Sequence, residues 1–244
     1  MYVIGDVHGC YKTLITLIDK LPLDEQIIFT GDLIDRGPSS KEVVQWVIDH
    51  SDKCRSVVGN HEKMLLAVQK KANILDVLIW ERNGGKNTLD SYFPETALET
   101  VFDETEEDRK KRLEMFKLRG KIAIPQEHLN FFNQMPLYIE EGNLFVSHSG
   151  WNPQIPWDEL LKDLYLLKGL AWFRGTPKKL PDNKFHIFGH TPVSNPEITD
   201  YYANIDTGAV FRDKEYGGKL TAIHYPSLLI YQQSNLDLPD IIIS

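Results

Sequence analysis

The sequence predicts an α/β protein whose main sheet is built from strand, turn and helix units, with a second sheet packed against it. Three observations support this class. Short apolar runs repeatedly end at a glycine, the first three runs are each followed by a helical pattern, and the last third of the chain is rich in strand patterns. The chain has 244 residues and is 42% hydrophobic, so one large domain is the expected organisation.

Five apolar, β-branched runs predict buried strands because each is short and ends at a tight turn. They are MYVIG, QIIFTG, RSVVG, NLFVSHSG and FHIFG. Helical spacing follows the first three runs, over Leu14–Leu21, Val43–Val47 and Met64–Val68. Ser39 and Glu42 match a capping box that would open the second helix. Strand, turn and helix in repeated succession indicate crossover connections within one sheet.

Two later regions differ from this pattern. Residues from about 73 to 121 contain a glycine pair and the charged stretch ETEEDRKKRLEMFKLRGK, and we expect a helical, cap-like insertion there. Near the C-terminus, ANIDTGAVF, KLTAIHYP and SLLIYQQ predict three consecutive strands, which we expect to form the second sheet.

Bulk composition excludes several classes of function. The net charge of −8 argues against general nucleic-acid binding, because proteins that bind the phosphate backbone usually carry a basic surface. No apolar tract is as long as a membrane span, which needs about eighteen residues. The first residues do not resemble a secretory signal, so we expect a cytoplasmic protein without membrane contact. Two cysteines, Cys10 and Cys54, are too few for a disulfide framework and are expected to be free thiols.

Polar residues of similar chemistry follow the predicted strands, where the turns of an open α/β sheet converge on one crevice. They are Asp6, His8, Asp32, Asp35, Arg36, Asn60, His61, His148 and His190. Any one of these turns is explained by turn chemistry alone, since glycine and aspartate favour turns. Five turns that all carry carboxylate, imidazole or amide groups instead predict a site for divalent metals such as manganese, iron, cobalt or zinc.

The motifs GDVHG, GDLIDRG, GNHE, HSG and GHT, in this order, resemble those of the PPP-type phosphoprotein phosphatases within the calcineurin-like metallophosphoesterases. WERNGGKNTLDSY and NIDTGAVF resemble the compact bacterial and phage-type members. The resemblance covers nearly the whole chain. It implies a four-layer αββα metallophosphoesterase fold, in which a two-sheet sandwich is flanked by helices, with two divalent metal ions at one edge. Manganese is the expected metal, with iron, zinc, cobalt or nickel as substitutes.

The resemblance also implies a role for each motif residue. Asp6 and His8 would bind the first metal, Asn60, His148 and His190 the second, and Asp32 would bridge both. A hydroxide that bridges the metals would attack phosphorus directly. His61, oriented by Asp35, would protonate the leaving oxygen, while Arg36, Asn60 and Arg174 would bind the substrate phosphate.

Two further positions allow more than one interpretation. Glu62 is either a support for the metal ligands or a first-turn acid favoured by the helix dipole. Ser149 stands where relatives usually have glycine or alanine, so this chain has an additional hydroxyl beside His148 that could alter the neighbouring hydrogen bonds or the access to the site.

The leading functional expectation is a metal-dependent phosphatase that hydrolyses phosphoserine or phosphothreonine, and also phosphotyrosine, in proteins, as well as small phosphoesters. The alternative is symmetrical hydrolysis of diadenosine tetraphosphate or another nucleotide phosphoesterase activity. A base-sized aromatic slot near Trp80, Tyr92 or Trp172 would favour nucleotides. A non-catalytic phosphate-binding scaffold is a third hypothesis, disfavoured because the complete set of expected residues is present.

Overall fold

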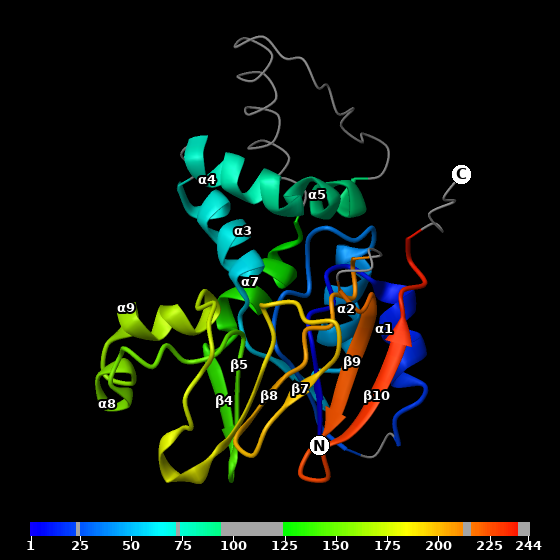
Figure 1. Ribbon diagram of the computed structural model, residues 1–244. Helices are drawn as coiled ribbons and strands as arrows, with labels where there is room; N and C mark the ends of the chain where they lie inside the picture. Colours follow the sequence, from blue (N-terminus) through cyan, green and yellow to red (C-terminus); the bar gives the residue numbers. More distant parts are fainter. Residues whose placement is uncertain (23–24, 72–73, 94–123, 212–215, 239–244) are drawn as a thin grey trace.

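The computed structural model describes residues 1–22, 25–71, 74–93, 124–211 and 216–238. Within these ranges the chain forms two five-stranded mixed sheets with helices on their outer sides (Figure 1). This arrangement confirms the predicted α/β sandwich. None of the helices in the described ranges combines the length and apolar character needed to cross a membrane.

The first sheet has the strand order β10-β9-β1-β2-β3. Its members are β1 (Tyr2–Ile4), β2 (Ile27–Phe29), β3 (Cys54–Ser56), β9 (Lys219–His224) and β10 (Leu229–Ser234). The strands β1, β2 and β3 are parallel, as the repeated strand, turn and helix pattern predicted, whereas β9 pairs antiparallel with β1. Since parallel strands end at the same edge, the turns after β1, β2 and β3 lie next to one another.

The second sheet has the order β4-β5-β6-β8-β7. It contains β4 (Tyr138–Glu141), β5 (Leu144–Ser147), β6 (Phe185–Phe188), β7 (Glu197–Ile198) and β8 (Tyr202–Asn204). Here β5, β6 and β8 are parallel, so the turns after β5 and β6 also share one edge.

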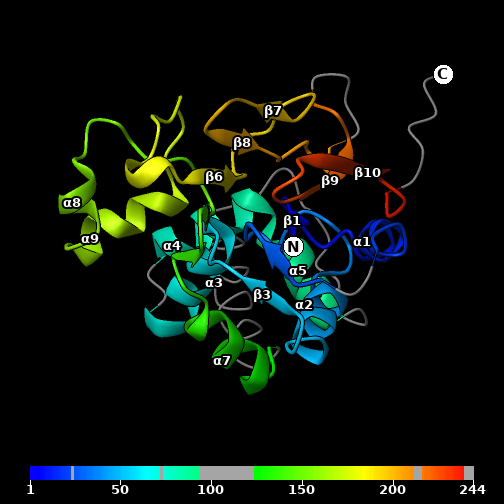
Figure 2. The same cartoon turned by 90° about the horizontal axis from the view of Figure 1, so that it is seen from below.

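Helices cover the outer sides of both sheets. On the first sheet pack α1 (Tyr11–Ile18), α2 (Ser40–Asp49), α3 (Asn60–Lys71) and α7 (Gln126–Gln134). The helices α4 (Ile74–Trp80) and α5 (Lys86–Tyr92), joined by the π-helical turn η1 (Glu81–Gly85), contact α3 and α2. Figure 2 shows α8 (Trp157–Leu160) and α9 (Leu164–Leu167) on the side of the molecule away from α1 and α2. Short 3-10 turns, η3 (Lys168–Ala171) and η4 (Pro181–Asn183), precede β6.

Alternation along the strands divides the core into layers. In β1, Val3 points to an inter-sheet cluster that also contains Ile28 of β2 and Val146 of β5. Tyr2 and Ile4 belong instead to the cluster between the first sheet and its helices. Each central strand therefore buries both faces, which is why its sequence is apolar without alternation.

Three expectations from the sequence require correction or comment. The last two predicted strands, β9 and β10, form a hairpin on the first sheet, while only ANIDTGAVF contributes β8 to the second. Helix α2 begins after Ser39 as predicted, but the Ser39 side chain makes no capping hydrogen bond. Of the expected insertion, residues 94–123 lie outside the described ranges; its first part forms α4, η1 and α5.

Candidate metal centre

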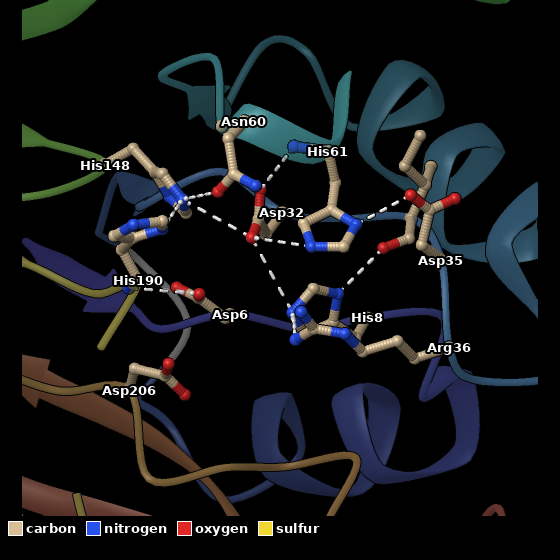
Figure 3. Close-up of polar contacts among 12 residues, drawn as sticks. Asp6, His8, Asp32, Asp35, Arg36, Asn60, His61, His148, His190 and Asp206 are labelled. Carbon is tan, nitrogen blue, oxygen red and sulfur yellow. Dashed lines mark hydrogen bonds and ion pairs between the residues drawn. The ribbon is translucent and has the colours of Figure 1, made fainter. Parts of the chain in front are cut away.

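The loops at the ends of both sheets bring most of the predicted site residues together (Figure 3). They come from the turns after β1 and β2, the first turn of α3, and the turns after β5 and β6. Asp6, His8, Asp32, Asn60, His61, His148 and His190 are all at least nine-tenths buried. Burial of this many ionisable groups in one place costs free energy unless they are paired or bind metal.

Backbone strain marks the same loops. His8, Asp32, Asp35, Arg36 and His190 all have positive φ, between 46° and 72°. For residues other than glycine this conformation is unfavourable and persists only where the surrounding structure holds it. Such strain concentrates at functional sites, and here it occurs in the loops after β1, β2 and β6 that carry the candidate donors.

One donor group consists of Asp32, His148 and His190, whose candidate ligand atoms lie within 4.8 Å of one another. His148 Nδ1 lies 2.8 Å from the carbonyl oxygen of Thr30 and donates to it, so the lone pair of neutral His148 is on Nε2. That Nε2 lies 2.9 Å from Asn60 Oδ1, 3.0 Å from His190 Nδ1 and 3.3 Å from Asp32 Oδ2. Acceptor atoms thus converge on one point, as they do around a cation.

A second donor group contains His8, Asp32 and His61, within the same 4.8 Å limit. His8 donates from Nδ1 to the Ile34 carbonyl at 2.8 Å, so its Nε2 carries the lone pair and lies 3.6 Å from Asp32 Oδ2. Asp32 belongs to both groups, in the position predicted for a bridging ligand.

Asp6 belongs to neither donor group among the described residues. Its Oδ2 accepts the His190 backbone N–H, and its Oδ1 accepts the Thr30 hydroxyl. Asp6 therefore lies beside the centre and supports the His190 loop, and its predicted coordination of the first metal stays a prediction.

Electrostatics separate the ligands into neutral and charged groups. Burial and then the positive charge of His148 lower the pKa of His190 to about 3, and burial together with Arg36 lowers the pKa of His8 well below its usual value. Burial opposes charge on His148 too, but Asp32 and Asp6 outweigh it and raise the pKa of His148 to about 9. Burial opposes charge on Asp32, yet His148 and His61 keep the pKa of Asp32 well below its usual value. A proton on His148 thus balances the negative charge of the Asp32 carboxylate, and a bound metal ion would take over this role.

The donor chemistry fits divalent metals. Both imidazoles His8 and His148 donate their second ring nitrogen to a backbone carbonyl, which fixes the orientation that metal-binding histidines require. His190 Nε2 is buried without a hydrogen-bond partner, so the polar contacts of this ring lie on its Nδ1 side, toward His148. Imidazole, carboxylate and amide oxygen suit borderline metals, and no thiolate occurs in either group.

Asp35 holds His61 and is itself held by residues of the α4–α5 region. His61 Nδ1 lies 2.6 Å from Asp35 Oδ2, and the Asp35 side chain is fully buried. Trp80 Nε1 donates to the Asp35 carboxylate at 2.9 Å, and the Thr88 hydroxyl donates to Oδ1 at 2.6 Å. The predicted His61–Asp35 pair is therefore present, with two supporting donors that the sequence did not suggest.

The same region fixes Arg36. The Arg36 backbone N–H donates to the Gly84 carbonyl at 3.2 Å, and Asn87 donates to the Arg36 carbonyl at 2.6 Å. A Cβ on Gly84 would lie 2.7 Å from both Arg36 N and Arg36 Cγ, so the approach requires glycine. The Arg36 guanidinium donates to His8 Nε2 at 2.8 Å and lies 5.4 Å from the Phe211 ring centroid. Arg36 thus places its positive charge at the edge of the donor groups.

Glu62 proves to be a support rather than a simple first-turn acid. Its carboxylate is fully buried and accepts the backbone N–H groups of Gly59, Asp32 and Leu33 at 2.8–3.0 Å. A Cβ on Gly59 would lie 2.0 Å from Asp32 Oδ1, so glycine lets the Asp32 carboxylate reach the first turn of α3.

Arg174 and Ser149 belong to the part of the chain near His148 and His190. Arg174 is exposed, and its charge is among the influences that lower the pKa of His190. The Ser149 hydroxyl accepts the Phe173 backbone N–H at 3.1 Å, one residue before Arg174. The unusual serine therefore ties the segment that carries Arg174 to the turn that carries His148.

Asp206 was also missed in the sequence. It is buried next to Asp6 (Figure 3), and burial raises its pKa to about 6 although the Gly208 backbone N–H and the charge of Arg36 lower it. Its signal was present in NIDTG, a buried acid directly after a strand, but without a histidine beside it the motif looked like an ordinary turn.

Paired sheets with two histidine and aspartate donor groups at their common edge define a metal-dependent phosphoesterase. The calcineurin-like phosphoesterase family profile matches residues 1–220, and the chain belongs to this family.

The chain is similar to the bis(5′-nucleosyl)-tetraphosphatase PrpE (asymmetrical) of Bacillus subtilis strain 168, with 29% identity over 256 residues, 93% of this chain and 91% of the relative. Two solved structures share its fold. A candidate diadenosine tetraphosphatase has a TM-score of 0.59 at 19% identity and covers 95% of this chain and 91% of its own. A protein serine/threonine phosphatase from Saccharomyces cerevisiae has a TM-score of 0.52 at 15% identity, covering 98% and 81%.

Proposed function

We propose that this protein is a dinuclear metallohydrolase that cleaves bis(5′-nucleosyl) tetraphosphates asymmetrically, by addition of water, to a nucleoside triphosphate and a nucleoside monophosphate. The observation that carries the hydrolase is the position of Asp32, whose carboxylate belongs to both donor groups. The substrate is supported by similarity to the PrpE relatives over most of both chains. The sequence offered hydrolysis of dinucleoside tetraphosphates as the alternative function, but with symmetrical rather than asymmetrical cleavage.

Two divalent ions would be held by Asp6, His8, Asp32, Asn60, His148 and His190. When bound, such ions polarise phosphate oxygens and lower the pKa of a shared water enough for attack at neutral pH. The two neutral imidazoles, His8 and His190, need lose no proton to serve as ligands, whereas His148 must release its proton.

His61 would donate a proton from Nε2 to the departing phosphate oxygen. Its Nδ1 is engaged by Asp35 at 2.6 Å, so Nε2 is the atom directed at the centre, 3.8 Å from Asp32 Oδ2. Asp35 would stabilise the charged ring and hold it in place through the change in protonation. Arg36, which contacts His8, and Arg174, whose charge acts on His190, would bind the phosphate chain together with Asn60.

Hydrolysis of phosphoproteins, expected first from the sequence, is the second candidate. It is favoured by the resemblance of the motifs to PPP-type phosphatases and by the fold shared with the yeast serine/threonine phosphatase. The same centre would serve both reactions, because metal ions and arginines recognise phosphate and the surrounding surface selects the rest of the substrate.

Metal-stripped protein reconstituted with manganese tests the proposal. It would be assayed on bis(5′-adenosyl) tetraphosphate, a phosphoserine peptide and p-nitrophenyl phosphate, with nucleotide products separated by chromatography. We expect preference for the dinucleotide, with ATP and AMP in equal amounts. Two molecules of ADP would instead establish symmetrical cleavage. Preference for the peptide would establish a phosphoprotein phosphatase. Metal binding without turnover of any substrate would support the non-catalytic phosphate-binding scaffold. Iron, zinc, cobalt and nickel would be compared in parallel.

A further inference from the structure

Of the three aromatic residues that could form a nucleobase slot, only one remains available. Trp80 is fully buried against Asp35, and Tyr92 is 7% exposed. Trp172 is 47% exposed and lines a cavity of about 190 Å³. Phe173, Leu170, Leu160 and Asn152 also line this cavity, so its walls are mainly apolar and aromatic with one amide.

The cavity is joined to the metal centre by the chain itself. Four of its lining residues, Gly169, Leu170, Trp172 and Phe173, lie in one segment that ends at Arg174. Ser149, the neighbour of His148, donates its backbone N–H to the Leu170 carbonyl at 2.6 Å and accepts the Phe173 N–H at 3.1 Å. The turn after β5 therefore connects the cavity to the donor group of Asp32, His148 and His190.

Size and chemistry favour a nucleobase over other groups. Cavities for whole drug-sized ligands span about 300–1,000 Å³, so a cavity of 190 Å³ suits one ring system rather than a nucleotide. The indole ring of Trp172 is about half exposed to solvent and offers a surface on which any nucleobase can stack. Arg174, directly after this wall, carries the positive charge that a phosphate attached to the nucleoside would meet.

We infer that the Trp172–Phe173 cavity is the subsite for one nucleobase of the nucleotide substrate, with Arg174 binding the adjoining phosphate and Ser149 positioning the segment. This inference rests on the proposed nucleotide hydrolase function. It assigns substrate selection to the segment 169–174, whereas the metal centre itself selects only phosphate.

Kinetics of two variants and one control test the subsite. Trp172→Ala should raise KM for bis(5′-adenosyl) tetraphosphate roughly 5- to 100-fold, as expected for loss of one base stack, with little change toward p-nitrophenyl phosphate. Trp172→Phe keeps a stacking ring and should remain within about threefold of the wild type. Tyr165→Ala removes an aromatic side chain that is 80% exposed on α9 and lines no part of this cavity, so it should leave both substrates unchanged.

A binding measurement separates this inference from the proposed function. Adenosine, which carries no phosphate, should quench tryptophan fluorescence saturably in the wild type, and Trp172→Phe should remove most of that quenching. Dinucleotide turnover with equal KM in the wild type and Trp172→Ala, both folded by thermal melting, would overturn the subsite and leave the function intact. Adenosine quenching without dinucleotide turnover would support the subsite and reject the hydrolase. Quenching that persists in Trp172→Phe would place the base elsewhere.

Discussion

Thr88→Val tests whether the α4–α5 region orients the proton donor. The substitution preserves the shape of the side chain and removes one hydroxyl, which donates to Asp35 Oδ1 at 2.6 Å and accepts the Asp35 backbone N–H at 2.9 Å. The N–H keeps a second partner, Ser40 Oγ at 3.1 Å, but the buried carboxylate loses one of its donors. The main cost is therefore one hydrogen bond to a charged group.

Such a bond contributes about 1.5–3 kcal/mol to the free energy of unfolding. In a chain of this length that corresponds to a fall in Tm of about 3–12 °C. The catalytic effect should depend on the leaving group, because general acid catalysis contributes most where the leaving oxygen is strongly basic. We expect about a tenfold lower kcat/KM for phenyl phosphate and less than a twofold change for p-nitrophenyl phosphate.

Thr13→Val is the matched control. Thr13 is also buried, and its hydroxyl donates to a carboxylate, Asp237 Oδ2, at 2.6 Å and accepts the Leu236 N–H at 2.9 Å. Asp237 is partly exposed, so the loss of stability should be smaller, and α1 contributes no residue to the donor groups. Urea unfolding and the two phosphate assays measure both effects. If Thr88→Val lowered both kcat/KM values equally, or if Thr13→Val changed their ratio as much, Thr88 would have no orienting role.

Three further outcomes are expected. Asp32→Asn should weaken binding of both metals, measured by calorimetry and metal analysis, and a variant that retained two ions would refute the bridging role. Gly84→Ala should raise KM for phosphate substrates and weaken inhibition by inorganic phosphate about tenfold, because its Cβ would displace Arg36; unchanged constants would show that Arg36 does not bind phosphate. Burial lowers the pKa of His186 to about 3. Below pH 6.5 the unfolded chain therefore binds a proton that the folded protein does not. As the pH decreases, the free energy of unfolding falls by about 1.4 kcal/mol per pH unit. His186→Phe should therefore lose about 2 kcal/mol less than the wild type between pH 6.5 and pH 5 in urea unfolding, and parallel losses would contradict this.

The convergence of the candidate donor side chains was predictable because their signals are local. Asp6, Asp32 and His148 each follow an apolar strand within a few residues, and parallel strands necessarily place such turns on one edge. The start of α2 was predictable for the same reason, from turn and helix chemistry near Ser39. A polar residue shortly after an apolar strand was therefore enough to identify most of the candidate donors from the sequence.

Long-range pairing was not predictable. Thr88 meets Asp35 across 53 positions of sequence, and no pattern around Thr88 marks it as the partner of a carboxylate. The β9–β10 hairpin has the alternation of any sheet strand, and only packing decides that β9 lies beside β1. The sequence left Trp80 as one candidate for a base-sized slot, and only the structure shows that its N–H donates to Asp35 inside the core.

The donor group of Asp32, His148 and His190 takes Asp32 from the turns of the first sheet, and both histidines from those of the second. An ion bound there would act as a cross-link between the two halves of the sandwich, in addition to its chemical role. Neither half alone offers the complete group, so binding of an ion by all three donors would require docked sheets and would be coupled to folding. Chelation should then loosen the contact between the layers before it unfolds either sheet.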